Sequence, residues 1–296
     1  MNNLEFMNKV YWKVRNTLGL TYNWELGIKE NKWVKKRNLN NIPIPAAIEI
    51  ETLNRCNGMC PFCPVNATTE QRPYAKMPDE LFKKIIDELK ELNYSGRLAL
   101  FSNNEPFLDE RIIDFMKYTK VSVPNAYLYI YTNGTVLTLE KYKESMEYLD
   151  GLYIDNYSDN DELLPEIKKI KEYIKNEKPE LYSRTVINMR LLNQSLFSRG
   201  GQAPNRQENL KRINTRCSYP YFQMVIRPDG KVSLCCNDAK GVYTMGNLNE
   251  SSIIEVWYSD KYKEIRKLMM DSGRKGLDLC RYCDTVGDVS ERTGEK

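Results

Sequence analysis

The sequence predicts an α/β protein, with a parallel sheet covered by helices and a smaller cysteine-rich unit after it. The first observation is a series of five β-branched or aromatic runs between residues 46 and 190, which alternate with four amphipathic segments. The second is a set of eight cysteines in two groups, one near the start and one in the last third. A chain of 296 residues has room for one large domain and a satellite.

The strands and helices of the sheet follow in order. Ile48-Glu-Ile-Glu-Thr-Leu alternates like a strand. Asp79 is the expected N-cap of a helix with apolar positions at Leu81, Phe82, Ile85, Ile86, Leu89 and Leu92. The same patterns predict further strands at 97–102, 126–131, 151–155 and 185–190, and further helices at 112–118, 140–148 and 163–174.

The last third has a different organisation. Residues 221–227 and 231–235 flank Pro228-Asp229-Gly230 and predict a β-hairpin. One helix is expected over 253–270, with apolar positions at Ile254, Val256, Trp257, Tyr262, Ile265 and Leu268.

Composition excludes several classes of protein. The net charge of +4 is too small for a nucleic-acid polyanion as the main partner. No apolar run reaches transmembrane length, and the start lacks the features of a signal peptide, so a cytoplasmic protein is expected. The chain has no histidine, which removes catalytic triads and His-ligated zinc. In a reducing compartment, clustered cysteines are expected to bind metal or do redox chemistry.

The first cysteine group is a short loop with the spacing C-x3-C-x2-C, at Cys56, Cys60 and Cys63. Three thiolates on one loop can hold three irons of a [4Fe–4S] cluster and leave the fourth iron open to an exogenous ligand. A structural zinc loop and coincidental buried thiols are the alternatives.

This loop, with Phe62 before its third cysteine, resembles that of the radical S-adenosylmethionine superfamily. The resemblance implies a partial (β/α) TIM-type barrel over 46–210, with S-adenosylmethionine and a [4Fe–4S] cluster at the carboxyl ends of the strands. Residues 1–45, which include Tyr11, Trp12 and Trp24, precede it as a helical, aromatic extension. A helix that clamps the barrel is the simplest interpretation of this extension, with partner docking or membrane contact as alternatives.

Polar residues follow the predicted strands. Asn103-Asn104-Glu105-Pro resembles the Gly-Gly-Glu-Pro element of the superfamily, which implies contact with the methionine amino group. Asn133 of Tyr131-Thr-Asn-Gly and Asn156 are further cofactor candidates by the same resemblance. A plain turn and a polar loop cap are the alternatives for these two residues.

The hairpin can bring Cys217 and Cys235 close to the closing C-x2-C of Cys280 and Cys283. Four thiolates can complete a second, fully ligated [4Fe–4S] cluster, and a four-thiolate zinc site is the alternative. Residues 211–288 resemble the twitch form of the SPASM domain, followed by a polar tail at 289–296. The remaining Cys236 could replace Cys235 as a ligand, face the substrate or pack as a small apolar residue.

Over residues 46–286 the chain resembles the 2-deoxy-scyllo-inosamine dehydrogenase family, most specifically at Ser198-Arg-Gly-Gly. The resemblance implies that Arg199 and Tyr131 meet a sugar or cyclitol alcohol that is oxidised to a ketone, with a flavodoxin- or ferredoxin-type reductant. Asn237 stands where that family has a substrate-facing Glu, which favours a neutral or phosphorylated substrate. A peptide maturase and an iron–sulfur electron carrier are the rival functions.

Overall fold

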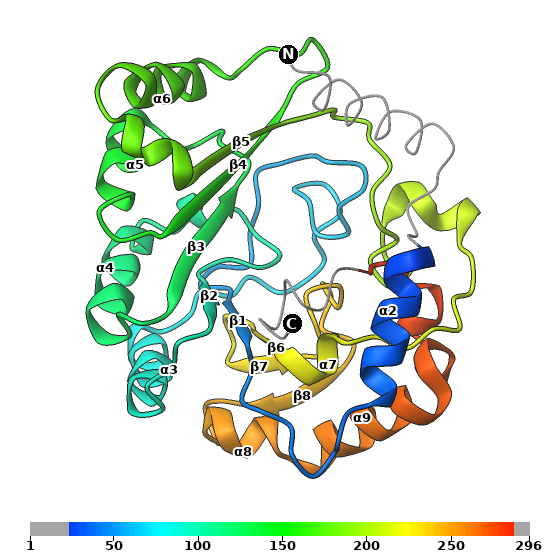
Figure 1. Ribbon diagram of the computed structural model, residues 1–296. Coiled ribbons are helices and arrows are strands. Elements are labelled where there is room, and N and C mark those ends of the chain that lie inside the picture. The colour runs from blue at the N-terminus through cyan, green and yellow to red at the C-terminus, as the bar shows by residue number, and fades with distance from the viewer. Residues whose placement is uncertain (1–23, 287–296) are drawn as a thin grey trace.

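The computed structural model describes residues 24–286, and its strands form one mixed eight-stranded sheet (Figure 1). Tyr11, Trp12 and the tail at 289–296 lie outside the described residues. The order across the sheet is β5-β4-β3-β2-β1-β6-β7-β8. The strands are β1 (Ala47–Ile50), β2 (Arg97–Ala99), β3 (Tyr127–Thr132), β4 (Gly151–Tyr157), β5 (Thr185–Arg190), β6 (Gln223–Ile226), β7 (Lys231–Ser233) and β8 (Thr244–Asn247).

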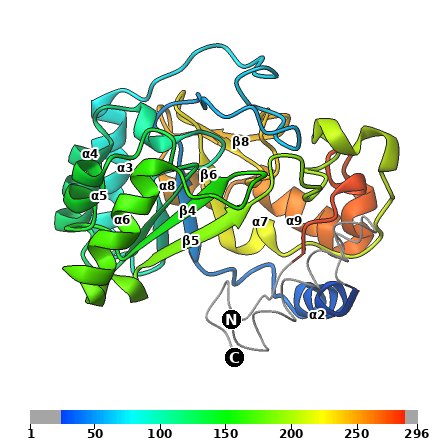
Figure 2. The same ribbon diagram turned by 90° about the horizontal axis from the view of Figure 1, so that it is seen from above.

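Helices connect the parallel strands and cover one face of the sheet, while the loop after β1 lies on the other side (Figures 1 and 2). This is the expected parallel α/β arrangement, and its strands β1 to β5 are the five predicted from the sequence. The helices are α2 (Trp24–Lys35), α3 (Asp79–Glu91), α4 (Ile112–Ser122), α5 (Leu139–Ser145), α6 (Pro165–Asn176), α7 (Tyr219–Phe222), α8 (Ile253–Trp257) and α9 (Asp260–Ser272).

The hairpin of the second cysteine group extends the same sheet. Strand β6 pairs in parallel with β1, in the register Ala47 to Gln223, and β7 and β8 continue antiparallel. All four residues of β1 and all four of β6 are buried, so each strand is covered on both faces. The strand before the first cysteine group, β1, is therefore the direct neighbour of β6, which lies between Cys217 and Cys235 in the chain.

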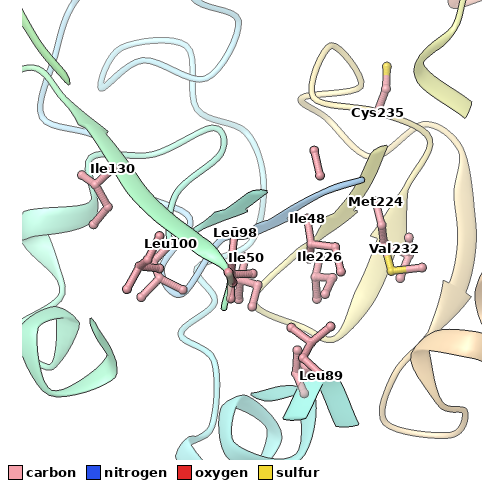
Figure 3. Close-up of a cluster of buried hydrophobic side chains, with 14 of the residues drawn as sticks. Ile48, Ile50, Leu89, Leu98, Leu100, Ile130, Met224, Ile226, Val232 and Cys235 are labelled. Atoms are coloured by element: carbon pink, nitrogen blue, oxygen red, sulfur yellow. The ribbon is translucent and has the colours of Figure 1, made fainter. Parts of the chain in front are cut away.

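The two faces of the sheet have different chemistry because side chains alternate along each strand. Ile48 and Ile50 of β1 belong to the apolar core that α3–α6 cover, and Figure 3 shows Ile50 and Ile226 near Leu89 of α3. Glu49, between the two isoleucines, is directed to the opposite face with the tyrosines of β3 and β4. The polar face is the one that the loop after β1 covers.

Two local predictions are wrong. Pro78 occupies the N-cap position of α3 and Asp79 is its first residue; the Asp79 carboxylate instead pairs with Arg111. The helix expected over 253–270 is two helices, because the Ser259 hydroxyl accepts a hydrogen bond from the Tyr262 amide and starts α9 anew. Ile253 and Met269 are fully buried, whereas the predicted apolar positions Ile254 and Leu268 are only partly buried.

A helix does form in the N-terminal extension. Trp33 of α2 packs edge-on against Tyr221 at 6.1 Å between ring centroids, and Val34 is fully buried. In Figure 1, α2 lies beside α9 and the C-terminal part of the chain. Among the described residues, no helix is both long and apolar enough to cross a membrane.

Candidate active site

The first cysteine loop follows β1 and is held by two side chains outside the motif. Asn66 is buried, and its amide donates to the backbone oxygens of Cys60 and Cys63 at 2.8 and 3.1 Å. Arg72 donates to both carboxylate oxygens of Glu51, at 3.1 Å each. These contacts fix the loop at the carboxyl end of β1.

The thiols of this loop suit a metal cluster better than they suit free thiolates. Burial raises the pKa of the Cys56 thiol to about 12 and that of Cys60 to about 11, and neighbouring thiols add to the shift. Positive metal ions would offset this cost. The Gly58 amide and the Asn133 side-chain amide lie 3.3 and 3.7 Å from the Cys56 sulfur and can stabilise negative charge on it.

Glu105 joins the ends of β2 and β3. Its carboxylate accepts from the Thr132 hydroxyl at 2.8 Å, the Asn133 amide at 2.7 Å and the Phe107 amide at 3.2 Å. Burial raises the Glu105 pKa to about 7, although these bonds favour the charged form. Three of the roughly four acceptor positions of the carboxylate are filled, so one remains for another donor.

The two asparagines before Glu105 differ in their surroundings. The Asn103 amide group donates to the Ser102 hydroxyl and to the backbone oxygen of Cys236. Asn104 accepts from the Ser102 amide at 3.0 Å, while its buried Nδ2 has no acceptor among the described residues. A buried amide donor without a partner is costly, and an acceptor from a bound cofactor would remove that cost.

The other two cofactor candidates lie in different settings. Phe62 packs on Tyr157 of β4, with ring centroids 5.9 Å apart. Asn156 lies inside β4, fully buried, and its side chain bonds the Glu162 oxygen and the Leu164 amide at 2.9 and 2.8 Å. This geometry favours the loop-cap alternative for Asn156.

The second cysteine group is buried, with Cys217, Cys235, Cys280 and Cys283 each 6–7% exposed. Burial raises the pKa of the Cys217 thiol to about 12, and it also raises those of Cys235 and Cys280. Within residues 24–286, no three Cys, Asp or Glu side chains are grouped closely enough to hold a single metal ion. A cubane cluster accepts thiolates that stand farther apart, because each binds a different iron.

The Ser198–Gly201 loop is fastened to this second group. The Ser198 hydroxyl donates to the Tyr282 backbone oxygen at 2.5 Å, and its amide donates to Asp284. Residues 199–201 all have positive φ angles, at 53, 64 and 79°. Two of them are glycines, which adopt this conformation without strain; Arg199 does not have that freedom.

Arg199 links the two halves of the site. Its guanidinium donates to the Asn103 side-chain oxygen and, at 3.1 Å, to the Cys236 backbone oxygen. Its buried Nε has no acceptor among the described residues. One guanidinium therefore touches the loop after β2 and the residue that follows Cys235, with a donor to spare.

A polar network that the sequence analysis missed lies beneath Arg199. Glu49 accepts from the Ser102 hydroxyl at 2.7 Å and from Gln223 at 2.8 Å, and Gln223 in turn accepts from the Cys236 amide. Burial raises the Glu49 pKa to about 7, while nearby Arg199 opposes the shift. An acidic residue between two isoleucines of a central strand is the signal that could have identified Glu49.

Tyr131 belongs to an aromatic wall on this face. It stacks on Tyr153 with ring centroids 4.5 Å apart and lies 5.3 Å from the Phe101 ring. Asn237, which directly follows Cys236, is buried, and its side-chain oxygen accepts from the Thr285 hydroxyl at 3.3 Å. Cys236 is half-buried, and its backbone lies between Asn103, Arg199 and Gln223.

Comparison with known proteins agrees with this architecture. Residues 50–194 match the radical SAM superfamily, and residues 217–284 match SPASM, an iron–sulfur cluster-binding domain. The chain therefore carries a radical SAM domain followed by a SPASM domain, which confirms the predicted α/β class and a cofactor set of S-adenosylmethionine and two iron–sulfur clusters.

Individual proteins also resemble this chain in sequence or in structure. The chain is 28% identical over 247 residues to the S-adenosyl-L-methionine-dependent 2-deoxy-scyllo-inosamine dehydrogenase of Niallia circulans, covering 82% of this chain and 94% of the relative. The crystal structure of BtrN with AdoMet and 2-DOIA superposes with a TM-score of 0.71 at 25% identity, over 83% of this chain and 95% of that one. Native anSMEcpe with bound AdoMet shares the fold alone, at 14% identity and a TM-score of 0.55, over 86% of this chain and 92% of that one.

Proposed function

We propose that this enzyme is a dehydrogenase that oxidises a secondary alcohol of a sugar or cyclitol to a ketone. The observation that carries the proposal is the position of Arg199, between Asn103 on the first cysteine group's side and Cys236 beside the second. A substrate held there meets both halves of the site. The similarity to a dehydrogenase of a cyclitol supports the same reaction class.

Each cysteine group has a proposed role. Cys56, Cys60 and Cys63 would hold the first cluster, and Cys217, Cys235, Cys280 and Cys283 the second. Asn104, Glu105 and Asn133 would bind S-adenosylmethionine, with Phe62 beside them. When bound, these groups supply a 5′-deoxyadenosyl radical, which takes a hydrogen atom, and an acceptor for one electron.

The chain's own residues position the alcohol and handle its proton. Arg199 would orient the hydroxyl oxygen and stabilise negative charge on it, because guanidinium stays protonated. Loss of a hydrogen atom from the carbinol carbon makes the hydroxyl acidic, and its proton must leave before the ketone forms. Glu49, beside Arg199 and with a pKa of about 7, is a carboxyl group suited to receive it.

The surroundings favour a particular type of substrate. The stacked rings of Tyr131 and Tyr153 form part of an aromatic wall against which a substrate ring can pack. Asn237 carries no charge where the dehydrogenase family has an acid, so we expect a neutral or phosphorylated ring. We further propose a cytoplasmic enzyme with a flavodoxin- or ferredoxin-type reductant.

Replacing Glu105 with alanine should weaken S-adenosylmethionine binding. An ammonium group of the cofactor would lose its charge-assisted partner, which corresponds to about ten- to hundredfold in Kd. Thr132→Val is the matched control, because it removes one bond to Glu105 but leaves the carboxylate. Calorimetry on the anaerobic protein measures both. A Glu105→Ala variant with the wild-type Kd would show that the carboxylate only holds the β3 turn.

Isotope transfer tests the reaction itself. A carbinol deuterium on the sugar or cyclitol substrate should appear in 5′-deoxyadenosine, with one ketone formed for each cofactor consumed. Mass spectrometry of metabolites, with and without the reduced enzyme, identifies that substrate. Deuterium that arrives from a peptide Cα or Cβ would favour a maturase, and the absence of 5′-deoxyadenosine would favour an electron carrier.

A further inference from the structure

A buried ion pair joins the N-terminal extension to the second cysteine group. The Arg274 guanidinium lies 2.9 Å from the Glu30 carboxylate of α2, with side-chain exposures of 1% and 0%. Glu30 also accepts from the Ser218 hydroxyl and amide, at 2.6 and 3.0 Å, directly after Cys217. Glu30 lies outside both segments that match a known domain.

Arg274 is bound to the cysteine segment as well as to Glu30. It donates to the backbone oxygens of Cys283 and Thr285, at 3.2 and 2.8 Å. Its buried Nε finds no acceptor among the described residues, so one N–H remains for a sulfur of a bound cluster.

The charge of Arg274 is secure in this setting. A guanidinium stays protonated in proteins, and here the Glu30 carboxylate lies 2.9 Å away as its counter-ion. A permanent positive charge therefore lies beside the proposed ligands, and its counter-charge comes from a helix of the extension. The charge, hydrogen bonds and burial around an iron–sulfur cluster set its reduction potential.

We propose that Arg274 and Glu30 form a pair that sets the reduction potential of the second cluster, with Arg274 raising it and Glu30 limiting the rise. The inference rests on the proposed function, in which this cluster accepts one electron from the alcohol radical as the hydroxyl proton leaves. A positive charge favours the one-electron-reduced form because that form is more negative. Both residues are positioning residues, since neither needs to touch the substrate.

The test is a redox titration of the full-length, reconstituted enzyme followed by electron paramagnetic resonance. The second cluster has no open iron, so its signal is the one that S-adenosylmethionine leaves unchanged. Arg274→Gln should lower the reduced-to-oxidised ratio at a fixed potential by about tenfold or more, and Glu30→Gln should raise it, as expected for one unit charge a few ångströms away. The double variant should return towards the wild-type ratio.

Arg266→Gln is the matched control, because Arg266 is also a buried arginine of the same region but bonds Pro220 and Trp257 and has no cysteine among its charged neighbours. It should leave the ratio unchanged. Shifts of the same sign in both single variants, or no shift in either, would overturn the proposal. If the Arg274→Gln variant does not assemble the second cluster, the Glu30→Gln variant alone decides: a higher reduced-to-oxidised ratio supports the proposal, and a lower or unchanged ratio overturns it. Wild-type protein with iron for one cluster only would instead contradict the proposed function.

Discussion

Replacing Cys56, Cys60 and Cys63 together with alanine should remove about half of the iron and abolish 5′-deoxyadenosine formation. Two [4Fe–4S] clusters amount to about eight irons per chain, and the triple variant would keep only the second cluster. Without the open iron of the first cluster, S-adenosylmethionine has no site for cleavage. Iron analysis after anaerobic reconstitution and chromatography of the dithionite-treated enzyme measure the two effects.

Cys236→Ala is the control for this experiment. Cys236 belongs to neither proposed ligand set; its backbone N–H and C=O are bonded to Gln223, Asn103 and Arg199, and its sulfur accepts from the Asn237 side-chain amide at 3.8 Å. That variant should retain about eight irons and full cofactor cleavage. Undiminished iron in the triple variant, or zinc in place of the second cluster, would contradict the assignment of the two groups.

Strands β1 to β4 were predictable because each is short, regular and followed by its own helix. The alternation of Ile48-Glu49-Ile50 reports a strand with one apolar and one polar face, and the structure has both. The first cysteine loop was predictable for a related reason, because its three thiols lie within one short segment. Local patterns of this kind need no knowledge of distant contacts.

Contacts between distant residues were not predictable. The pairing of β6 with β1 and the bond between Glu30 and Ser218 join segments that are far apart in sequence, 188 residues for the second of them. The prediction of a single helix over 253–270 was wrong because hydrophobic periodicity does not reveal an N-cap within the segment, which here is Ser259. The sequence therefore indicated two cysteine groups. It did not indicate that β1 and β6 pair between them, or that α2 contacts the second group.

Parts of the candidate site depend on the same distant contacts. The position of Arg199 could be expected only from a family resemblance, since its partners Asn103 and Cys236 come from two other segments. Asn156 follows an apolar run like the other strand-end residues, yet its side chain holds the 162–164 loop. Residue type and position along a strand do not distinguish a residue that faces the site from one that holds a loop. Only the contacts with neighbouring residues distinguish them.

Replacing Cys280 and Cys283 with alanine should stop ketone formation while cleavage of S-adenosylmethionine continues. Both residues lie in the segment that contacts the Ser198 loop. The first cysteine loop is held separately, by its connection to β1 and by hydrogen bonds from Asn66 and Arg72, so the substitutions should leave it intact. Without the second cluster the alcohol radical has no acceptor for its electron, so 5′-deoxyadenosine should form with little or no ketone. The ratio of ketone to 5′-deoxyadenosine, near one in the wild type, should fall by at least tenfold.

Arg199→Ala distinguishes loss of the electron acceptor from collapse of the loop. It removes the guanidinium but leaves the Ser198 bonds to Tyr282 and Asp284 in place. Both clusters should therefore remain, at about eight irons per chain, while the ratio of ketone to 5′-deoxyadenosine falls because the oxygen is no longer held. Circular dichroism and iron content establish that each variant is folded. Ketone formed at the wild-type ratio by the Cys280, Cys283 double variant would exclude the second cluster as the electron acceptor, and the same result for Arg199→Ala would remove Arg199 from the substrate site.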